Sequence, residues 1–366
     1  MNQLPEHTAL NIRSFSHIFD NKAESYKLFW FQSLFHQVLQ GKRSLSFEEI
    51  IDEMIADAWY MVSEYHLNLG PFDKLEETVN YLSGYCPLIA SEKKETILQM
   101  LKESTDPKLR SFKRTLSLNV PYRLQAPFFV DMKWNLKKPE LIARINGSKG
   151  LIYTFEMYDG LNTRIVVAEE WAQYFMKHPI ILESWIEYNM VTYLQRRNPS
   201  TPGIIYKLRP PISRSLGKVQ KYWKHVMTLD PVVEIYDHQP LDSSISIDHF
   251  VPWSYVAHDE FWNLHPTTRS INSSKGNQLP EWNTYFPRFC DLQYRSYSLM
   301  WQYDTLHQEF ERLAREHINN LDIKEKLYQP GLDPHTFVLR MNDVIYPVYH
   351  AAMQAGFRVW NYESNH

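Results

Sequence analysis

One stretch of the sequence contains an acid, an imidazole and two amides in an order that could support hydrolysis. Asp248 and His249 are adjacent, and Asn263 and Asn272 follow at intervals of 14 and 9 residues. Because imidazole titrates near neutral pH, His249 is suited to take a proton from water as a general base. Asp248 and Asn272 offer the hard oxygen atoms that Mg²⁺ prefers. Cleavage of a phosphodiester needs an activated water and a neutralised phosphate. A base can activate the water, and a divalent cation beside it can neutralise the phosphate.

The same stretch resembles the HNH nucleases, also called ββα-metal or His-Me finger nucleases. Their pattern is an Asp-His pair at a strand end, a central Asn, and a final His or Asn that opens a helix. Here these positions fall on the four residues named above, and the last is Asn, as in the HNH domains of CRISPR effector nucleases. Pro252 and Lys275, each three residues after a motif position, also fit. The resemblance covers residues 244–280 only.

The resemblance implies a role for each of these positions. His249 would be the catalytic base, and Asp248 and Asn272 would hold Mg²⁺ or Mn²⁺. Asn263 would tie down the loop between the two strands and so hold the base in place. Lys275 would contact either the phosphate or a nearby strand. We therefore expect a ββα-metal module in which an Asp and a His meet at the end of a strand.

Each of these residues, taken alone, has a plainer interpretation. An isolated His249 would more often be a hydrogen-bonded core histidine, and an isolated Asn263 or Asn272 would more often cap a helix or a turn. Their order and spacing together favour the nuclease. His258 and His265 fall in the intervening loop, where we expect side chains exposed to solvent rather than groups that approach the phosphate.

The surrounding sequence predicts helices on both sides of the motif. Apolar residues at helical spacing predict helices over 26–38, 46–62, 73–83, 91–103, 180–196, 282–318 and 335–357. Ser46 followed by Glu49 is the signature of a capping box. Two apolar segments that flank Asp159-Gly160 predict a β-hairpin near 151–168. The expected fold is mainly α with a small antiparallel β component (α+β), with the HNH module embedded between helical regions.

Proline marks the main boundary between domains. Pro199, Pro202, Pro210 and Pro211 are too dense for a regular element and favour a connector. We expect four segments in order: a mainly helical domain over 1–200, a basic linker over 201–229, the HNH module over 230–300 and a helical segment packing on it over 301–366. The first domain would bind a signal, a partner or DNA.

Positive charge is concentrated locally although the formal net charge is −3. Residues 188–229 carry eight Lys or Arg residues and no Asp or Glu. A nucleic-acid partner needs a local positive surface rather than a positive total. This stretch therefore predicts a groove for the DNA backbone, the alternative being a solvated face and linker. The residues expected to contact DNA are Arg209, Arg214, Lys218, Lys221, Lys224 and, after the motif, Asn277.

Composition excludes several other classes of protein. The 366 residues are 44% hydrophobic and 14% aromatic, which is typical of a folded chain and not of a disordered one. Cys86 and Cys290 form no CxxC pair, so a zinc ribbon is excluded, and a disulfide framework is not needed. No apolar run approaches the roughly 18 residues of a membrane helix, and residues 1–10 lack the features of a signal peptide. We expect a cytoplasmic protein without a membrane partner.

These observations together predict a metal-dependent endonuclease that hydrolyses DNA. One alternative is an RNA-cleaving HNH nuclease, although no RNA-binding module is visible. Another is a catalytically silent scaffold that binds DNA or is regulated by a partner. One HNH site nicks one strand at a time, so a double-strand break needs a homodimer or two encounters, and the N-terminal domain is the expected surface for a partner. Analogy with other HNH fusions in prokaryotes predicts a role in defence or restriction.

Overall fold

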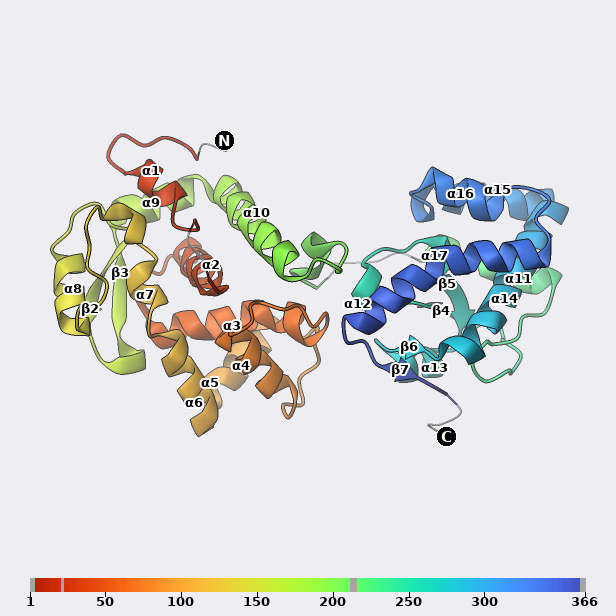
Figure 1. Ribbon diagram of the computed structural model, residues 1–366, viewed down its shortest axis with the longest axis horizontal. Helices are drawn as coiled ribbons and strands as arrows, with labels where there is room; N and C mark the ends of the chain where they lie inside the picture. Colours follow the sequence, from red (N-terminus) through yellow and green to blue (C-terminus); the bar gives the residue numbers. More distant parts are fainter. Residues whose placement is uncertain (1–3, 21–22, 211–215, 363–366) are drawn as a thin grey trace. The chain divides into compact units, whose positions relative to one another are not determined.

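Helices dominate the computed structural model, which describes residues 4–20, 23–210 and 216–362 (Figure 1). The predicted fold class is confirmed: small β-sheets are embedded among many helices. The chain divides into two compact units. Unit 1 comprises Met1–Pro199 and Lys207–Pro210, and unit 2 comprises Ser200–Tyr206 and Pro211–His366. The HNH motif lies entirely in unit 2.

Unit 1 combines helices with a three-stranded antiparallel sheet in the order β1-β3-β2. The strands are β1 (Ser44–Ser46), β2 (Tyr153–Met157) and β3 (Arg164–Val167). The α-helices are α1 (Ile12–Ser16), α2 (Tyr26–Leu39), α3 (Phe47–Ser63), α4 (Lys74–Ser83), α5 (Lys94–Glu103), α6 (Pro107–Leu116), α7 (Val120–Arg123), α8 (Lys138–Asn146), α9 (Glu169–Lys177) and α10 (Pro179–Arg197). Two 3₁₀ turns are η1 (Ala126–Phe128) and η2 (Gly160–Asn162).

Local sequence accounts for the ends of several helices in unit 1. At the start of α3, Ser46 accepts a hydrogen bond from the Glu49 N–H, and the Glu49 carboxylate accepts one from the Ser46 N–H. This complete capping box satisfies backbone donors that a helix start leaves unpaired. The Asp73 side chain caps α4 by accepting hydrogen bonds from the Leu75 and Glu76 N–H groups, and α10 ends at Arg197, one residue beyond the predicted end.

Aromatic side chains form the core of unit 1. Phe15 makes ring contacts with Phe31, Trp171 and Trp185, whose centroids lie 4.9–5.4 Å from its own. These residues come from α1, α2, α9 and α10, so the core joins the first and last helices of the unit. The aromatic residues of the N-terminal region therefore serve mainly in packing, as expected from their helical spacing.

The hairpin near 151–168 is present, but its connection differs from the predicted Asp159-Gly160 turn. A 3₁₀ turn lengthens the connection, and the register shifts at an irregularity between Phe155 and Met157. β1, which pairs antiparallel with β3, was not predicted. A strand of three residues is too short to show an alternation of apolar and polar side chains.

Unit 2 contains two short sheets and a set of longer helices. Its strands are β4 (Ser246–His249), β5 (Leu264–Thr267), β6 (Leu279–Pro280) and β7 (Val359–Trp360). Its helices are α11 (Gly217–Leu229), α12 (Trp253–Val256), α13 (Arg269–Lys275), α14 (Trp282–Gln302), α15 (Asp304–His317), α16 (Leu321–Tyr328) and α17 (Pro334–Gln354), with a 3₁₀ turn η4 (Phe261–Asn263). A further 3₁₀ turn, η3 (Ile204–Lys207), lies in the connector. β4 and β5 pair antiparallel, whereas β6 and β7 pair parallel.

Helices brace the β4–β5 sheet of unit 2. A two-stranded sheet is marginally stable by itself in water. Here the Gln293 side chain on α14 donates a hydrogen bond of 2.8 Å to the Leu264 carbonyl on β5. The Phe250 ring, just after β4, packs on Phe289 of α14 with 4.6 Å between centroids. These contacts attach the sheet to α14, which lies in a segment predicted to be helical.

Three further predictions about the elements need correction or comment. The expected linker over 201–229 is a helix from Gly217 on, because Val219, Tyr222 and Trp223 of α11 are buried in the core of unit 2. The predicted helical region over 282–318 is two helices that break at Tyr303, which has an extended backbone. Among the residues described, no helix is both long and apolar enough to cross a membrane.

Candidate HNH active site

Two strands and a helix bring the motif residues together. β4 ends at the Asp248-His249 pair, and its antiparallel partner β5 places His265 opposite Asp248. α13 packs on β4 and contributes Asn272 and Lys275, which are three residues apart and so lie on one helix face. The order strand, strand, helix is the ββα arrangement that the resemblance implied.

The Asp248 carboxylate lies in a buried polar network at the end of β4. Asp248 is only 4% exposed. Its two oxygens lie 3.2 and 3.0 Å from the Lys275 ammonium, and one of them also lies 3.2 Å from the Tyr236 hydroxyl and 3.4 Å from His265 Nε2. Burial alone would raise the pKa of Asp248, but the Lys275 charge and His265 outweigh it and hold this pKa well below its usual range. The carboxylate is therefore ionised.

Lys275 acts on the strand in this structure. It is fully buried, and its ammonium donates a 2.7 Å hydrogen bond to the His249 carbonyl in addition to its ion pair with Asp248. Of the two contacts expected for Lys275, the structure contains the one to the nearby strand. A single side chain thus fixes both residues of the Asp-His pair.

The His249 imidazole engages a residue that the sequence did not single out. Its Nε2 lies 2.8 Å from Oδ1 of Asp259, in the loop between α12 and η4. His249 is 6% exposed, so the ring lies at the edge of the packed interior. The sequence shows Asp259 only as an acid four residues before Asn263. Without the path of the loop, this position does not indicate a contact with His249.

His265 was expected to be a solvent-exposed loop residue, and this prediction is wrong. It lies in β5, is fully buried, and faces Asp248 across the sheet. Tyr236, which precedes the motif, is also buried against it, with ring centroids 5.6 Å apart. The register of β4 against β5 places His265 opposite Asp248, and this register could not be read from the sequence. His258 is half-buried.

Asn263 ties the chain after β4 to the chain before β5. It is fully buried, and its amide both accepts a 2.8 Å hydrogen bond from the Val251 N–H and donates one of 2.8 Å to the Val251 carbonyl. Its own carbonyl accepts a hydrogen bond from the Phe250 N–H. This geometry matches the tethering role that the resemblance implied.

Replacing Asn263 by Ala should therefore lower both stability and catalysis. The change leaves the buried N–H and carbonyl of Val251 without their partners, at a cost of about 1–3 kcal/mol each. Urea unfolding should show the loss, and the cleavage rate should fall because the backbone next to His249 loosens. Asn283→Ala, at an exposed position on α14, is the control. Unchanged stability in the Asn263 variant would contradict the tethering role.

Asn272 and Asp248, the two residues predicted to hold a metal, are both attached to β4. The Asn272 amide nitrogen donates to Ser246 Oγ (3.0 Å) and the Ile247 carbonyl (3.2 Å), which fixes the orientation of the amide. The other predicted ligand is the ionised Asp248 carboxylate on that strand. Mg²⁺ commonly takes few protein oxygens and keeps several waters. Within the described part of the chain, no cluster of three His, Cys, Asp or Glu side chains is arranged for a metal.

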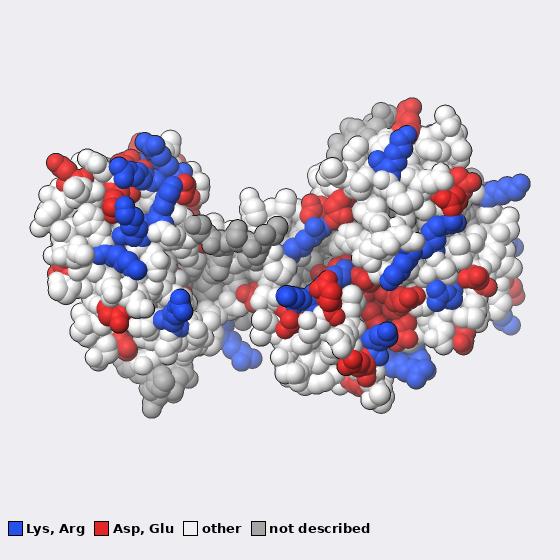
Figure 2. Space-filling view, turned by 180° about the vertical axis from the view of Figure 1, so that it is seen from behind, with Lys and Arg blue, Asp and Glu red and all other residues white. Residues whose placement is uncertain are grey.

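Several residues predicted to contact DNA are ion-paired within the protein. The stretch 188–229 has no acid of its own, but acids from elsewhere reach it. Lys218 pairs with Glu316, and Lys221 lies 2.9 Å from Glu309, both acids being on α15. In Figure 2, which shows unit 2 on the left, Lys and Arg side chains accordingly lie among Asp and Glu side chains. The premise that these cations have no acid to pair with is wrong.

The other predicted contacts fall in different places. Lys224 and Asn277 are exposed on unit 2, and Arg214 lies outside the described residues. Arg209 belongs to unit 1, where it pairs with Glu183 and Glu187. The predicted set is therefore divided between the two units, and α11 carries its largest described part.

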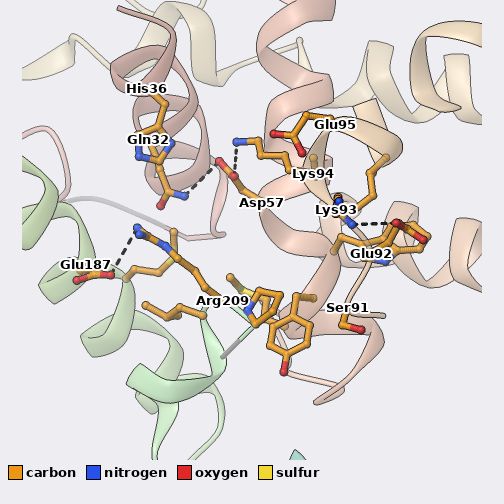
Figure 3. A pocket seen from close by; sticks show the side chains of 18 residues that line it. Gln32, His36, Asp57, Ser91, Glu92, Lys93, Lys94, Glu95, Glu187 and Arg209 are labelled. Carbon is orange, nitrogen blue, oxygen red and sulfur yellow. Dashed lines mark hydrogen bonds and ion pairs between the residues drawn. The ribbon is translucent and has the colours of Figure 1, made fainter. Parts of the chain in front are cut away.

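Arg209 lines a pocket of about 590 Å³ in unit 1 (Figure 3). The pocket is formed by parts of α2, α3 and α10, the start of α5 and residues 208–210. Its charged side chains pair with one another: Lys94 lies 2.6 Å from Asp57, and Arg209 lies 3.5 Å from Glu187. Because these side chains are already ion-paired, they offer less charge to a polar ligand.

Comparison with known proteins agrees with the geometry of the site. A family model described as HNH endonuclease matches residues 233–281, which include β4, β5 and α13. No match was found among curated proteins, and none among solved structures. The matched segment contains the Asp-His pair, the tethering Asn and the Asn-Lys pair of α13. Residues 233–281 therefore match the HNH endonuclease family in sequence, within a longer, mainly helical chain.

Proposed function

We propose that unit 2 is a metal-dependent endonuclease that hydrolyses phosphodiester bonds in DNA. The observation that carries the proposal is the arrangement at the end of β4. There a base held by an acid, His249 with Asp259, is adjacent in the chain to an ionised carboxylate, Asp248. The amide of Asn272 is tied to the same strand. These groups supply a general base and two hard oxygen ligands within one packed module.

Each residue of the site has a separate role in the proposed hydrolysis. His249 takes the proton from the attacking water, while Lys275 and Asn263 hold the backbone on which the base is mounted. Asp248 and Asn272 would hold Mg²⁺ or Mn²⁺, which when bound supplies charge neutralisation at the phosphate. Because the side chains are held in place before reaction, little reorganisation of the protein is needed at the barrier.

The solvent face of α11 is the surface we propose for the DNA backbone. Lys218, Lys221 and Lys224 recur every third residue on the exposed face, opposite the buried Val219 and Trp223. The ion pairs of Lys218 and Lys221 with α15 involve lysines exposed at the surface, where such pairs contribute little, so a phosphate can replace the acid. Phosphate contacts of this kind give affinity without sequence preference.

Changing these three lysines to Gln should weaken DNA binding and its dependence on salt. Each lost phosphate contact lowers the slope of log K against log salt by about 0.9, so a loss of up to about three contacts is expected to flatten it by roughly 2–3. Fluorescence anisotropy over a salt series measures the slope. The matched control is Lys133, Lys137 and Lys149 to Gln, which removes the same charge from exposed positions of unit 1. An equal slope for wild type and the α11 variant would place DNA elsewhere.

The substrate is tested by offering DNA and RNA of one sequence to the full-length protein. Double-stranded DNA, single-stranded DNA and RNA are incubated with Mg²⁺ or Mn²⁺, and product lengths are resolved on a gel. Cleavage of DNA in preference to RNA supports the proposal. Preferential RNA cleavage would replace DNA by RNA as the substrate, and absence of cleavage on every substrate would favour a silent scaffold.

Unit 1 is the region that we propose to control or target the nuclease. It packs its own core and holds its own pocket, and the family match does not extend to it. A homodimer or another protein partner bound through unit 1 is consistent with the need to cut two strands with single sites. The role in prokaryotic defence or restriction stays a prediction from analogy.

A further inference from the structure

We propose that Asp259 is a positioning residue that selects the tautomer of His249 and fixes its ring, and that the end of α15 holds Asp259 in place. This inference rests on the proposed nuclease function, in which His249 is the base. It extends the active site beyond the residues of the motif pattern. It also assigns a part in catalysis to helices that lie outside the segment matched by the HNH family model.

The contact between the two side chains determines which nitrogen is basic. His249 Nε2 lies 2.8 Å from Asp259 Oδ1, and their side chains are 8% and 21% exposed. An ionised carboxylate only accepts hydrogen bonds, so Nε2 carries the proton and donates it. The lone pair of the neutral ring then belongs to Nδ1. Asp259 therefore orients the ring with Nδ1 as the atom that receives the proton of the attacking water.

The loop that carries Asp259 is anchored by residues at and just after the end of α15. His317 Nδ1 donates a 2.8 Å hydrogen bond to the Asp259 carbonyl. The next carboxylate, Glu260, accepts hydrogen bonds from the Asn319 N–H (3.1 Å) and from the Asn319 side-chain amide (2.7 Å). Both His317 and Glu260 are buried. On the other side of the loop, Asn263 ties the chain to the end of β4.

These contacts make a continuous support for the base. α15 holds the backbone of residue 259, the Asp259 carboxylate holds the His249 ring, and Lys275 holds the His249 carbonyl. Partners that orient a catalytic group typically contribute about 10–100-fold to activity. The hydrogen bonds are short enough to restrain the ring in the absence of substrate.

The test is a double-mutant cycle on cleavage rate with full-length protein. Asp259→Ala should lower the single-turnover rate by about 10–100-fold, and Asp259→Asn, which keeps an acceptor, should lose less. In the His249→Ala background, Asp259→Ala should cost no further activity, because the residue acts through the ring. Asp343→Asn, at an exposed carboxylate paired with Lys326, is the matched control. Additive losses would overturn the proposal, as would a wild-type rate in Asp259→Ala.

A second readout does not depend on cleavage. In protein labelled with ¹⁵N at histidine, the resonances of His249 are identified by their loss in His249→Ala. At a pH where the ring is neutral, wild type should show the Nε2–H tautomer, and Asp259→Ala should shift toward a mixture. A mixture in wild type would overturn the inference. If wild type shows the predicted tautomer but cuts no nucleic acid, the proposed function fails while the positioning role of Asp259 stands.

Discussion

Replacing His249 by Ala should reduce the cleavage rate by about 10²–10⁴-fold while leaving DNA affinity within roughly 2-fold of wild type. The expected loss is large because the imidazole is the group positioned to take the proton of water, supported by Asp259 and by the Lys275 bond to its carbonyl. Affinity should persist because it comes mainly from cations that contact phosphates elsewhere. Single-turnover rates with excess enzyme measure the first quantity, and anisotropy in EDTA measures the second.

The control for this prediction is an exposed histidine of the same unit. His238 is exposed and follows an Asp in the chain, so His238→Ala changes the same residue type within a similar dipeptide. Its cleavage rate should match that of wild type. If His249→Ala cuts at the wild-type rate, then His249 is not the base. If both variants lose activity equally, the effect is not specific to the site.

Replacing Asp248 by Asn should abolish metal binding and cleavage, and it should also destabilise unit 2. The variant removes the only charge partner that the described residues offer within 4.0 Å of the buried Lys275 ammonium. Breaking a buried pair in this way costs about 3–5 kcal/mol. Loss of the carboxylate also removes the stronger of the two proposed metal ligands. Mn²⁺ binding followed by electron paramagnetic resonance should show a large loss of affinity.

A second variant separates the effect of Asp248 on metal binding from its effect on the stability of the fold. In Asp248→Asn with Lys275→Met, no ammonium is left buried without a carboxylate, so urea unfolding should return toward wild type. Mn²⁺ affinity and cleavage should stay lost, because the ligand is still absent. The exposed Asp343→Asn variant should leave both properties unchanged. Wild-type Mn²⁺ affinity in the double variant would show that Asp248 is not a ligand.

The arrangement of the motif residues could be predicted because the motif is local. Asp248, His249, Asn263 and Asn272 lie within 25 residues of one another, on a strand end, a short turn and a short helix. Some helices of both units, such as α3 and α17, were predictable for a similar reason, whereas α11 fell in the predicted linker. Apolar residues at helical spacing and caps such as Ser46 act within a few residues.

Contacts between distant segments could not be predicted in this way. Asp259 reaches His249 only because the loop after α12 folds back, and that path is set by α15. His265 was misplaced because its burial depends on the register of β5 against β4. Lys218 has no acid near it in the sequence, but Glu316 of α15 reaches it when α11 packs into unit 2. Each of these results depends on tertiary packing that a linear pattern does not encode.

The most direct test of the central claim is a plasmid assay with purified full-length protein. Supercoiled DNA is incubated with wild type, His249→Ala and Asp248→Asn in EDTA, Mg²⁺ or Mn²⁺. With wild type and the metal we expect nicked and then linear DNA, and in EDTA or with either variant we expect intact supercoiled DNA. Cleavage that persists in EDTA, or that survives the loss of His249, would contradict the assignment of the HNH site as the catalytic centre.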